Sequence, residues 1–162
     1  MTAARAAAVT LRPLRTSDRD RVEAMTRGTA LFRDDELPVA LEVFLATAAG
    51  TDTYEGIGAE LDGRLVGWAS WGPVPCTLGT FDLYWIVVDP ACQGAGIGGR
   101  MLAAMEERVA GRARLICVET AGRSDYEATR AFYERRGYSA VALIPDYYAP
   151  GDDLVTFVKR LD

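Results

Sequence analysis

Glycines gather near the middle of the chain, at Gly94, Gly96, Gly98 and Gly99. The apolar residues of 97–109 then recur at helical spacing, which predicts a helix that begins among these glycines. The first N–H groups of a helix lack intrahelical partners and carry the positive end of its dipole. Because glycine has no side chain to block an approaching anion, the stretch predicts a phosphate- or pyrophosphate-binding site.

A single charge interrupts the apolar run that precedes this loop. Residues 81–88 are almost all apolar or β-favouring, so we expect a strand covered on both faces, which Asp89-Pro90 ends. The exception is Asp82. A carboxylate in a buried strand is costly and asks for a reason, which is either proton transfer or a structural role such as pairing with an arginine. Both alternatives remain open from the sequence.

Three kinds of nucleotide site use glycine-rich loops. A P-loop ends in Gly-Lys-Ser/Thr, and the chain has Gly98-Gly99-Arg100 instead, which excludes it. Gly94, Gly96 and Gly99 match the dinucleotide pattern G-x-G-x-x-G, but residues 89–93 separate them from the strand, and only about half of a dinucleotide domain's usual length remains.

The third pattern is the acyl-CoA loop Q/R-x-x-G-x-G/A. Gln93, Gly96 and Gly98 satisfy it in full. The remaining alternative is a glycine-rich turn that binds no ligand.

Bulk composition excludes several classes of function. The chain has 162 residues, of which 49% are hydrophobic, enough for one domain with a single core. We expect a disordered N-terminus at 1–8 and one domain over 9–162. The net charge of −5 argues against nucleic-acid or anionic-membrane partners, which require a basic surface. No apolar run approaches the ~20 residues of a membrane span, so we expect a cytoplasmic protein.

Cysteine and histidine usage argues against a metal centre. The three cysteines, Cys76, Cys92 and Cys117, have no metal-ligand spacing, and the chain contains no histidine. A zinc site or a histidine-based triad within one chain is therefore excluded. Cys92 lies beside the glycines, where a small buried apolar role is favoured over a nucleophilic one.

The elements that position these residues follow from periodicity and turn signals. The pattern predicts strands at 9–14, 54–61, 65–71, 81–88, 115–119, 138–144 and 154–159, and helices at 18–26, 38–48, from the glycines to near 111, and 126–136. Asp62-Gly63 predicts a two-residue hairpin turn, Thr16 or Ser17 a helix N-cap, and 145–153 a loop. This order predicts a mixed α/β sheet.

A second motif follows the glycine loop. Residues 130–138, R-A-F-Y-E-R-R-G-Y, are similar to the helix end F-Y-E-x-x-G-F/Y of the GNAT superfamily of acyl-CoA-dependent N-acyltransferases. Together with the loop at Gln93 and the strand order, the chain from Val9 onward resembles that family. The resemblance implies a mostly antiparallel, seven-stranded central sheet, splayed in the middle and flanked by about four helices.

The resemblance also implies the contacts to acetyl-CoA. Backbone groups at the end of the central strand would bind the pantetheine arm in the splayed sheet, and loop N–H groups would hold the pyrophosphate. The residues so implied are Ile86, Val87, Val88, Gln93, Gly94, Ala95, Gly96, Ile97, Gly98, Gly99 and Arg100.

Transfer of an acetyl group to an amine makes specific demands on side chains. The ammonium must lose a proton to a carboxylate, and the resemblance adds Glu119 to Asp82 as a base candidate. A backbone N–H such as that of Val88 could stabilise the oxyanion of the intermediate. Tyr133 aligns with the family's tyrosine acid, which would protonate the leaving thiolate; packing in the core is its alternative role.

Tyrosines are the candidates for holding the acceptor amine. Tyr84 shares a strand face with Asp82 and could position a water, and Tyr147 and Tyr148 resemble the tyrosines with which peptide-acetylating members hold a substrate N-terminus. Tyr126 departs from the family, where many members have an asparagine that bonds the pantetheine arm.

The sequence therefore predicts a cytoplasmic N-acetyltransferase that acts on a primary amine of a small molecule or a peptide or protein, as a monomer or a homodimer. A non-catalytic acyl-CoA sensor is the alternative, and a Rossmann oxidoreductase comes third.

Overall fold

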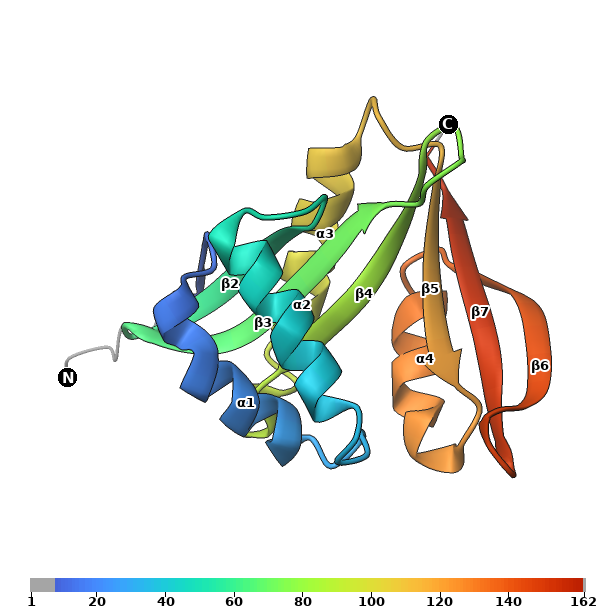
Figure 1. Cartoon of the computed structure of the whole chain (residues 1–162), viewed down its shortest axis with the longest axis horizontal. Helices are drawn as coiled ribbons and strands as arrows, with labels where there is room; N and C mark the ends of the chain where they lie inside the picture. Colours follow the sequence, from blue (N-terminus) through green and yellow to red (C-terminus); the bar gives the residue numbers. More distant parts are fainter. Residues whose placement is uncertain (1–7, 162) are drawn as a thin grey trace, which may run out of the picture. The chain divides into compact units, whose positions relative to one another are not determined.

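The described part of the chain forms one seven-stranded mixed sheet with four α-helices (Figure 1). The structure is a computed structural model and describes residues 8–161, so the predicted disordered segment lies, apart from Ala8, outside the described residues. The strand order is β1-β2-β3-β4-β5-β7-β6. Strand β4 runs parallel to β5, whereas β1 with β2, β5 with β7, and β6 with β7 are antiparallel. The predicted fold class is confirmed.

The elements lie close to their predicted positions. The strands are β1 Thr10–Arg12, β2 Glu55–Leu61, β3 Arg64–Pro73, β4 Thr80–Val88, β5 Leu115–Ala121, β6 Ser139–Ala149 and β7 Asp152–Arg160. The helices are α1 Arg19–Gly28, α2 Leu37–Ala49, α3 Ile97–Val109 and α4 Glu127–Glu134. Short 3-10 turns η1 Thr16–Asp18, η2 Pro90–Cys92 and η3 Ser124–Tyr126 connect them.

By their contacts, the described residues group into two compact units. The first contains the chain up to Ser70 together with Trp85–Arg108, and the second contains Trp71–Tyr84 and the chain from Val109 onward. The first unit therefore holds β1, β2, most of β3 and α1 to α3, and the second holds β5 to β7 and α4. Strand β4 contributes its first half to the second unit and its second half to the first.

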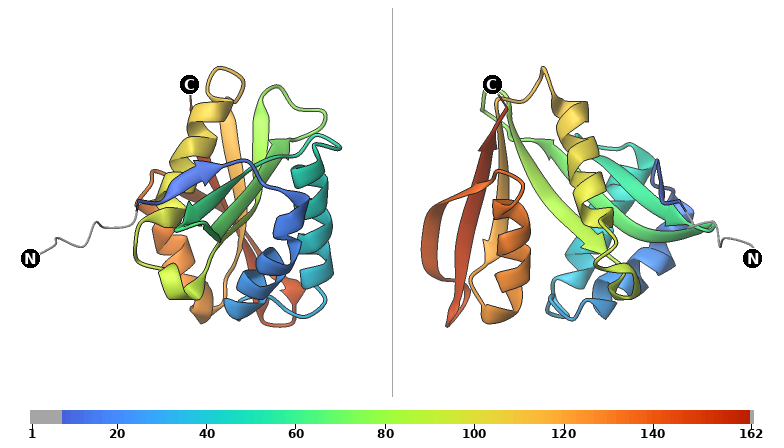
Figure 2. Two further views of the ribbon diagram at one scale, coloured as in Figure 1. Left: turned by 90° about the vertical axis from the view of Figure 1, so that its left-hand side faces the viewer. Right: turned by 180° about the vertical axis from the view of Figure 1, so that it is seen from behind.

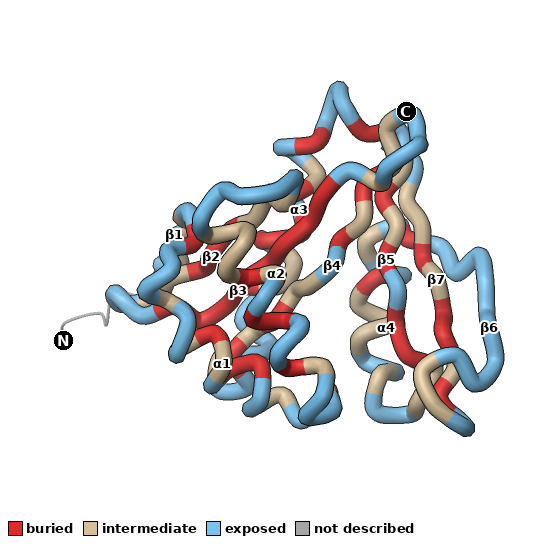
Figure 3. Tube along the Cα trace, viewed as in Figure 1, coloured by how far each residue is buried: buried red, intermediate tan, exposed pale blue. Residues whose placement is uncertain are grey.

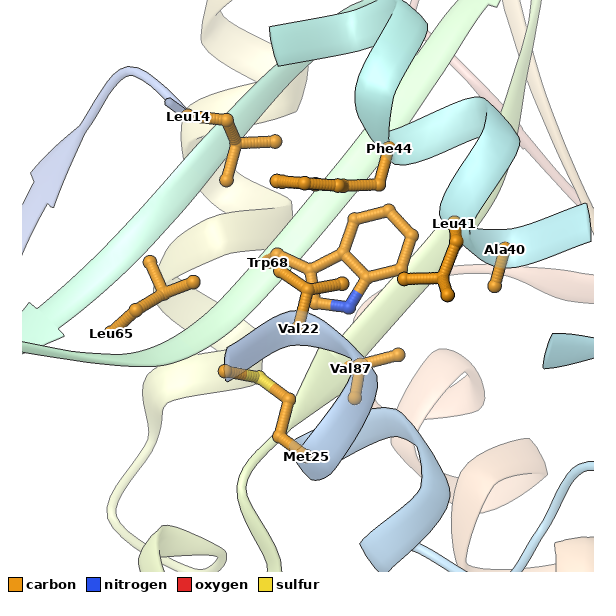
Figure 4. Packing of buried hydrophobic residues seen from close by; sticks show 9 residues of the cluster. All are labelled: Leu14, Val22, Met25, Ala40, Leu41, Phe44, Leu65, Trp68 and Val87. Atoms are coloured by element: carbon orange, nitrogen blue, oxygen red, sulfur yellow. The ribbon is translucent and has the colours of Figure 1, made fainter. Parts of the chain in front are cut away.

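Helices cover both faces of the strands in the first unit. Figures 1 and 2 show α1 and α2 on one face of β2 and β3, and α3 on the other. The core beneath α1 and α2 centres on Trp68, which is fully buried and whose indole N–H donates to the Thr26 hydroxyl at 3.1 Å. Its ring meets Phe44 edge to face at a centroid distance of 5.8 Å. Figure 4 shows nine residues of this cluster: Leu14, Val22, Met25, Ala40, Leu41, Phe44, Leu65, Trp68 and Val87.

In the first unit, one glycine lets a helix pack closely on a strand, and two others adopt a left-handed backbone. A Cβ added to Gly67 would lie 2.9 Å from Met101 Cε, so glycine at this point of β3 lets α3 pack closely. Asp62 and Gly63 have φ values of 50° and 77°, which confirms the predicted hairpin turn. Gly50, with φ of 67°, ends α2 as predicted.

The second unit is built on β5, β7, β6 and the first half of β4, with α4 against this part of the sheet. Pairing of β4 with β5 runs from Thr80–Leu115 to Leu83–Val118, so it involves only the first part of β4. Tyr133 of α4 is 2% exposed, and its ring lies 6.0 Å from that of Phe157 on β7. The inner face of α4 therefore packs against β7.

Three local expectations were wrong. Strand β4 is not covered on both faces, because Phe81 and Leu83 are buried whereas Tyr84 is 40% exposed. The N-cap residue of α1 is Asp18, not Thr16 or Ser17, because the η1 turn precedes the helix. The Asp18 side chain makes no capping bond to α1, and its Oδ2 instead accepts from the Arg15 N–H at 2.9 Å at the start of η1.

The third error concerns 145–153, most of which is strand and not loop. Asp146 adopts φ of 55°, its N–H donates to Asp153 Oδ1 at 2.9 Å, and its Oδ1 accepts from the Gly151 N–H at 2.7 Å. The register of β6 on β7 shifts between Ile144 and Ala149, so the irregularity is absorbed and the strand continues past Pro145. Figure 3 shows that β6 is exposed along most of its length.

Candidate active site

The glycine loop begins with a capped turn at the end of β4. The Asp89 N–H donates to the Val66 carbonyl of β3 at 2.8 Å, and Asp89 Oδ1 accepts from the Ala91 N–H at 2.9 Å. The Cys92 N–H then donates to the Asp89 carbonyl at 2.8 Å, which closes the η2 turn. Strand β4 is thereby joined to the loop in a fixed conformation. Cys92, predicted to be buried, is only partly buried.

The loop itself is bare backbone. Gly94 and Gly96 have φ values of 84° and 77°, a left-handed conformation that residues with side chains rarely adopt. A Cβ added to either would meet nothing within 4 Å, so no other part of residues 8–161 fills the space beside them. An anion could approach this backbone without displacing a side chain of the described residues, and the phosphate site itself stays a prediction.

The first turn of α3 has backbone N–H groups without an acceptor inside the helix. Helix α3 starts at Ile97, which is 2% exposed and anchors the end of the loop in the core. The Arg100 N–H already donates to the Gly96 carbonyl at 3.1 Å. In a helix, the N–H groups before that first bond have no intrahelical acceptor, and here they belong to Ile97, Gly98 and Gly99.

Two predicted cofactor contacts have their side chains engaged elsewhere. Arg100 Nη1 donates to the Val9 carbonyl at 2.7 Å, and Gln93 Nε2 donates to the Val88 carbonyl at 3.5 Å. The Val87 side chain is 3% exposed and belongs to the Trp68 core, so alternation along β4 turns Ile86 and Val88 the other way. Any ligand contact at Val87 must therefore involve its backbone.

In the second unit, the two predicted carboxylates share one face of the sheet. Asp82 is the register partner of Cys117, and Glu119 lies two residues further along β5, so the three side chains point to the same side. Asp82 is partly buried and Glu119 is exposed. Burial and the negative charge of Glu119 raise the pKa of Asp82 above its ordinary value. A carboxylate with a raised pKa is a stronger base.

Cys117 lies opposite Asp82 in the β4–β5 register and two residues from Glu119 on β5, a position that the sequence analysis did not assign to it. Burial and the charges of Asp82 and Glu119 raise the pKa of its thiol. The thiol is therefore protonated at neutral pH, which disfavours a nucleophilic role.

Tyr133 lies in the core of the second unit. Its ring contacts Phe132 at 5.1 Å, Tyr138 at 5.5 Å and Phe157 at 6.0 Å between centroids. Burial raises the pKa of its phenol, so the hydroxyl keeps its proton at neutral pH. The packing role considered for Tyr133 is therefore real, and it is compatible with a role as proton donor.

The tyrosines predicted to hold the acceptor lie on strands. Tyr84 is on β4 and 40% exposed. Tyr147 and Tyr148 lie near the end of β6 with their rings perpendicular and 5.0 Å apart. Burial and then the charge of Glu119 raise the pKa of Tyr148, so Glu119 lies within electrostatic range of that phenol.

Sequence analysis missed one ion pair at the start of the glycine loop and another beside Tyr126. Arg21 of α1 is paired with Asp89, and Arg21 Nε donates to the Leu65 carbonyl at 2.9 Å. Arg123 pairs with the buried Asp152 at 2.9 Å and lies over the ring of Tyr126 at 5.1 Å. Residues this far apart in the sequence leave no periodic signal of their pairing. Of the four residues, the sequence analysis singled out only Asp89, because it precedes Pro90 at the end of β4.

Residues 8–161 offer neither a metal site nor a membrane-spanning helix. No group of three or more His, Cys, Asp or Glu residues in this range could hold a metal ion. No helix in it is long and apolar enough to cross a membrane.

Comparison with known proteins agrees with the motifs. Residues 52–140 match the model of the acetyltransferase (GNAT) domain. A blasticidin-S acetyltransferase of Streptomyces morookaense is 36% identical over 122 residues, which is 75% of this chain and 77% of that protein. An uncharacterized N-acetyltransferase of Methanocaldococcus jannaschii is 31% identical over 63% of this chain, and the match spans 64% of that protein's length.

Solved structures share the fold. A crystal structure of a protein assigned to the GNAT family of acetyltransferases, from Desulfovibrio desulfuricans, superposes with a TM-score of 0.88 at 36% identity, and the match covers 96% of this chain and all of that one. A Salmonella typhimurium protein solved with acetyl-CoA has the same fold, with a TM-score of 0.75, 19% identity, and 96% and 95% of the two chains covered. The chain therefore belongs to the GNAT family of acetyltransferases, which confirms the enzyme class predicted from its two motifs.

Proposed function

We propose that the protein transfers the acetyl group of acetyl-CoA to a primary amine of a small molecule or of a peptide or protein. The observation that carries this proposal is the bare first turn of α3. Gly94 and Gly96 adopt conformations that favour glycine, open space lies beside both, and the free N–H groups of the helix follow directly.

This turn fits a pyrophosphate. The N–H groups of Ile97, Gly98 and Gly99 would donate to its oxygens, and the positive end of the α3 dipole would favour its charge. Backbone groups of Gln93, Gly94, Ala95 and Gly96 would complete the cradle. The backbone of Ile86, Val87 and Val88 would bind the pantetheine arm, since it ends the same strand from which the loop departs.

Asp82 is the favoured base for the acceptor amine. An ammonium of pKa ~10.4, or ~7.7 to 8.0 for an α-amine, must lose a proton before it can attack the thioester carbon. Asp82 is partly buried and has no ion pair among those found in the described residues. Its raised pKa makes it a stronger proton acceptor than an ordinary aspartate. Glu119 is the second candidate and, on the same face, can accept from the ammonium directly or through a water.

The remaining steps involve the oxyanion and the leaving thiol. Attack of the amine turns the carbonyl oxygen into an oxyanion, to which the Val88 N–H would donate. The C–S bond then breaks, and the thiolate takes a proton from Tyr133, whose raised pKa keeps the phenol protonated at neutral pH until that step. The nitrogen of the new amide gives up its extra proton, directly or through water, and this proton restores the Tyr133 phenol. The products are an N-acetyl amine and coenzyme A.

The acceptor would lie against exposed aromatic rings. Tyr84 is on the strand that carries Asp82, and Tyr148 is within electrostatic range of Glu119, so both are near a candidate base. Tyr147, 52% exposed, adds an aromatic face for an organic amine. The blasticidin-S relative supports a small-molecule acceptor.

Thiol release from acetyl-CoA, measured over a panel of amines, tests this proposal. The panel should contain aminated antibiotics, polyamines, amino acid amides and short peptides with free N-termini. We expect amine-dependent thiol release and an acetylated product of 42 Da added mass, the mass of one acetyl group in exchange for a proton. A protein that binds acetyl-CoA but turns over none of these amines would favour the non-catalytic sensor.

A further inference from the structure

We propose that Arg21 is a positioning residue for acetyl-CoA, which holds the start of the glycine loop in its binding conformation through Asp89. The inference rests on the proposed acetyl-CoA site and adds to it a residue of α1 that belongs to neither family motif. Its basis is the set of contacts that Arg21 and Asp89 make within the first unit.

Arg21 joins three elements at one point. Its Nε donates to the Leu65 carbonyl at the start of β3, and its Nη2 is paired with Asp89 Oδ2 at the end of β4. The Asp89 N–H donates to Val66, the next residue of β3. Both side chains are mostly buried, with 22% and 12% of their surfaces exposed.

The two carboxylate oxygens of Asp89 have partners in different elements, one in helix α1 and the other in the loop. Oδ2 is paired with Arg21, whereas Oδ1 accepts from the Ala91 N–H at 2.9 Å inside the η2 turn. The arginine therefore fixes the orientation of the carboxylate that closes the first turn of the loop. Rotation of an unpaired carboxylate would give up the bond to Ala91.

The loop needs such an anchor because little else constrains it. Residues 93–96 are all exposed, and nothing lies within 4 Å of a Cβ added to Gly94 or Gly96. Glycine-rich backbone has many accessible conformations, so ordering it around a ligand is costly. At the far end Ile97 is held in the core, and at the near end Asp89 is held by Arg21.

Loss of the near anchor lowers the fraction of molecules whose loop is ready to bind. The apparent dissociation constant of a ligand rises in inverse proportion to that fraction. If the loop is ready in roughly a tenth of the molecules of an Arg21→Met variant, CoA binds roughly tenfold more weakly. Catalysis in the bound state should change much less, because Arg21 touches no reacting atom.

The experiment measures CoA affinity by calorimetry and donor kinetics for the wild type, Arg21→Met and a control. Arg19→Met is the matched control, since Arg19 lies on the same helix in exposed pairs with Asp20 and Glu23. We expect Arg21→Met to raise the CoA Kd and the KM for acetyl-CoA roughly tenfold, with kcat and the KM for the amine within about twofold. Arg19→Met should bind CoA as the wild type does.

A truncated donor separates positioning from general damage. S-Acetylpantetheine lacks the pyrophosphate, so the Arg21→Met defect should disappear with it. Asp89→Asn should weaken CoA binding by a similar factor, and the double variant should be no worse than Arg21→Met, because both remove one interaction. If Arg21→Met does not fold, Arg21→Lys, which keeps the charge but loses the forked donors, takes its place.

Unchanged CoA affinity in a folded Arg21 variant would overturn the inference, as would a defect of equal size with the truncated donor. Failure of the wild-type protein to bind CoA would instead overturn the proposed function.

Discussion

At the scale of single residues, Asp82 combines a structural cost with a chemical use. Its pKa is raised, so the folded state favours the protonated carboxyl. A group of this kind contributes stability below its ordinary pKa of ~3.9, and that contribution is lost as the pH rises through the raised value. At neutral pH, the ionised carboxylate therefore lowers the free energy of unfolding.

Asp82→Asn should consequently make the protein more stable at pH 7, because it removes that charge and keeps the shape. The gain in melting temperature should vanish at pH values below the ordinary pKa of aspartate, where the wild-type carboxyl is protonated in both states. Thermal melts of both proteins from pH 3 to 8 check this. A wild-type protein that is the more stable of the two at pH 7 would indicate an unseen partner for Asp82.

The same variant tests the assignment of the base. If Asp82 accepts the amine's proton, Asp82→Asn should lower kcat/KM by ~10²-fold and remove the acidic limb of its pH profile. Glu119→Gln should keep the limb. If Glu119→Gln removes the limb and Asp82→Asn does not, the roles are reversed, and if both keep it, neither carboxylate is the base.

Tyr133→Phe separates the acid from the packing residue. The phenyl ring preserves the contacts with Phe132, Tyr138 and Phe157, so the melting temperature should barely change. Loss of the hydroxyl should lower kcat by ~10²-fold while the affinity for CoA is retained. Wild-type turnover in this variant would assign Tyr133 to the core alone.

At the scale of elements, close packing of β2 against its neighbours depends on glycine. A Cβ at Gly56 would lie 2.6 Å from the Ala69 carbonyl oxygen and 2.4 Å from Thr47 Cγ2. The carbonyl belongs to β3 and cannot move without disrupting the sheet.

Gly56→Ala should therefore destabilise the protein by about 1–3 kcal/mol, as overpacked positions do. The control is Gly28→Ala at the end of α1, where an added Cβ meets only Pro90 side-chain atoms at 3.7 and 3.9 Å. Alanine there should be neutral or stabilising by up to ~1 kcal/mol. Urea denaturation of both variants measures the difference, and equal stabilities would contradict this account of β2.

Elements with a local signal were predictable from the sequence. The turn at Asp62-Gly63 needs two residues with left-handed backbone, and the glycines before Ile97 indicate where α3 begins. The turn and the start of α3 therefore lie where the sequence predicts them. The predicted strand ended at residue 144, five residues before the end of β6, because Pro145 and Asp146 are typical of turns. Nothing in the local sequence shows that Asp146 bonds to Gly151 and Asp153 and lets the strand continue.

The candidate site was predictable to the same extent. The glycine loop and Tyr133 lie in contiguous motifs, whereas the Arg21–Asp89 pair joins residues that only the fold brings together. The alternation of strands allowed Asp82 and Tyr84 to be placed on one face. The proximity of Cys117 and Glu119 to Asp82 depends on the β4–β5 register, which periodicity does not determine.

At the scale of the whole molecule, β4 connects the two halves of the proposed chemistry. Its second half leads into the loop that would bind acetyl-CoA, and its first half carries Asp82 among the groups that would move protons. The central claim is that the loop before α3 is an acyl-CoA site. Every catalytic assignment depends on it.

Thermal unfolding with and without acetyl-CoA tests this claim most directly. A ligand that binds only the folded state stabilises it by ~2.7 kcal/mol when present at 100 times its dissociation constant. We expect saturating acetyl-CoA to raise the melting temperature and NADH at the same concentration to leave it unchanged. A clear shift with NADH and none with acetyl-CoA would contradict the account.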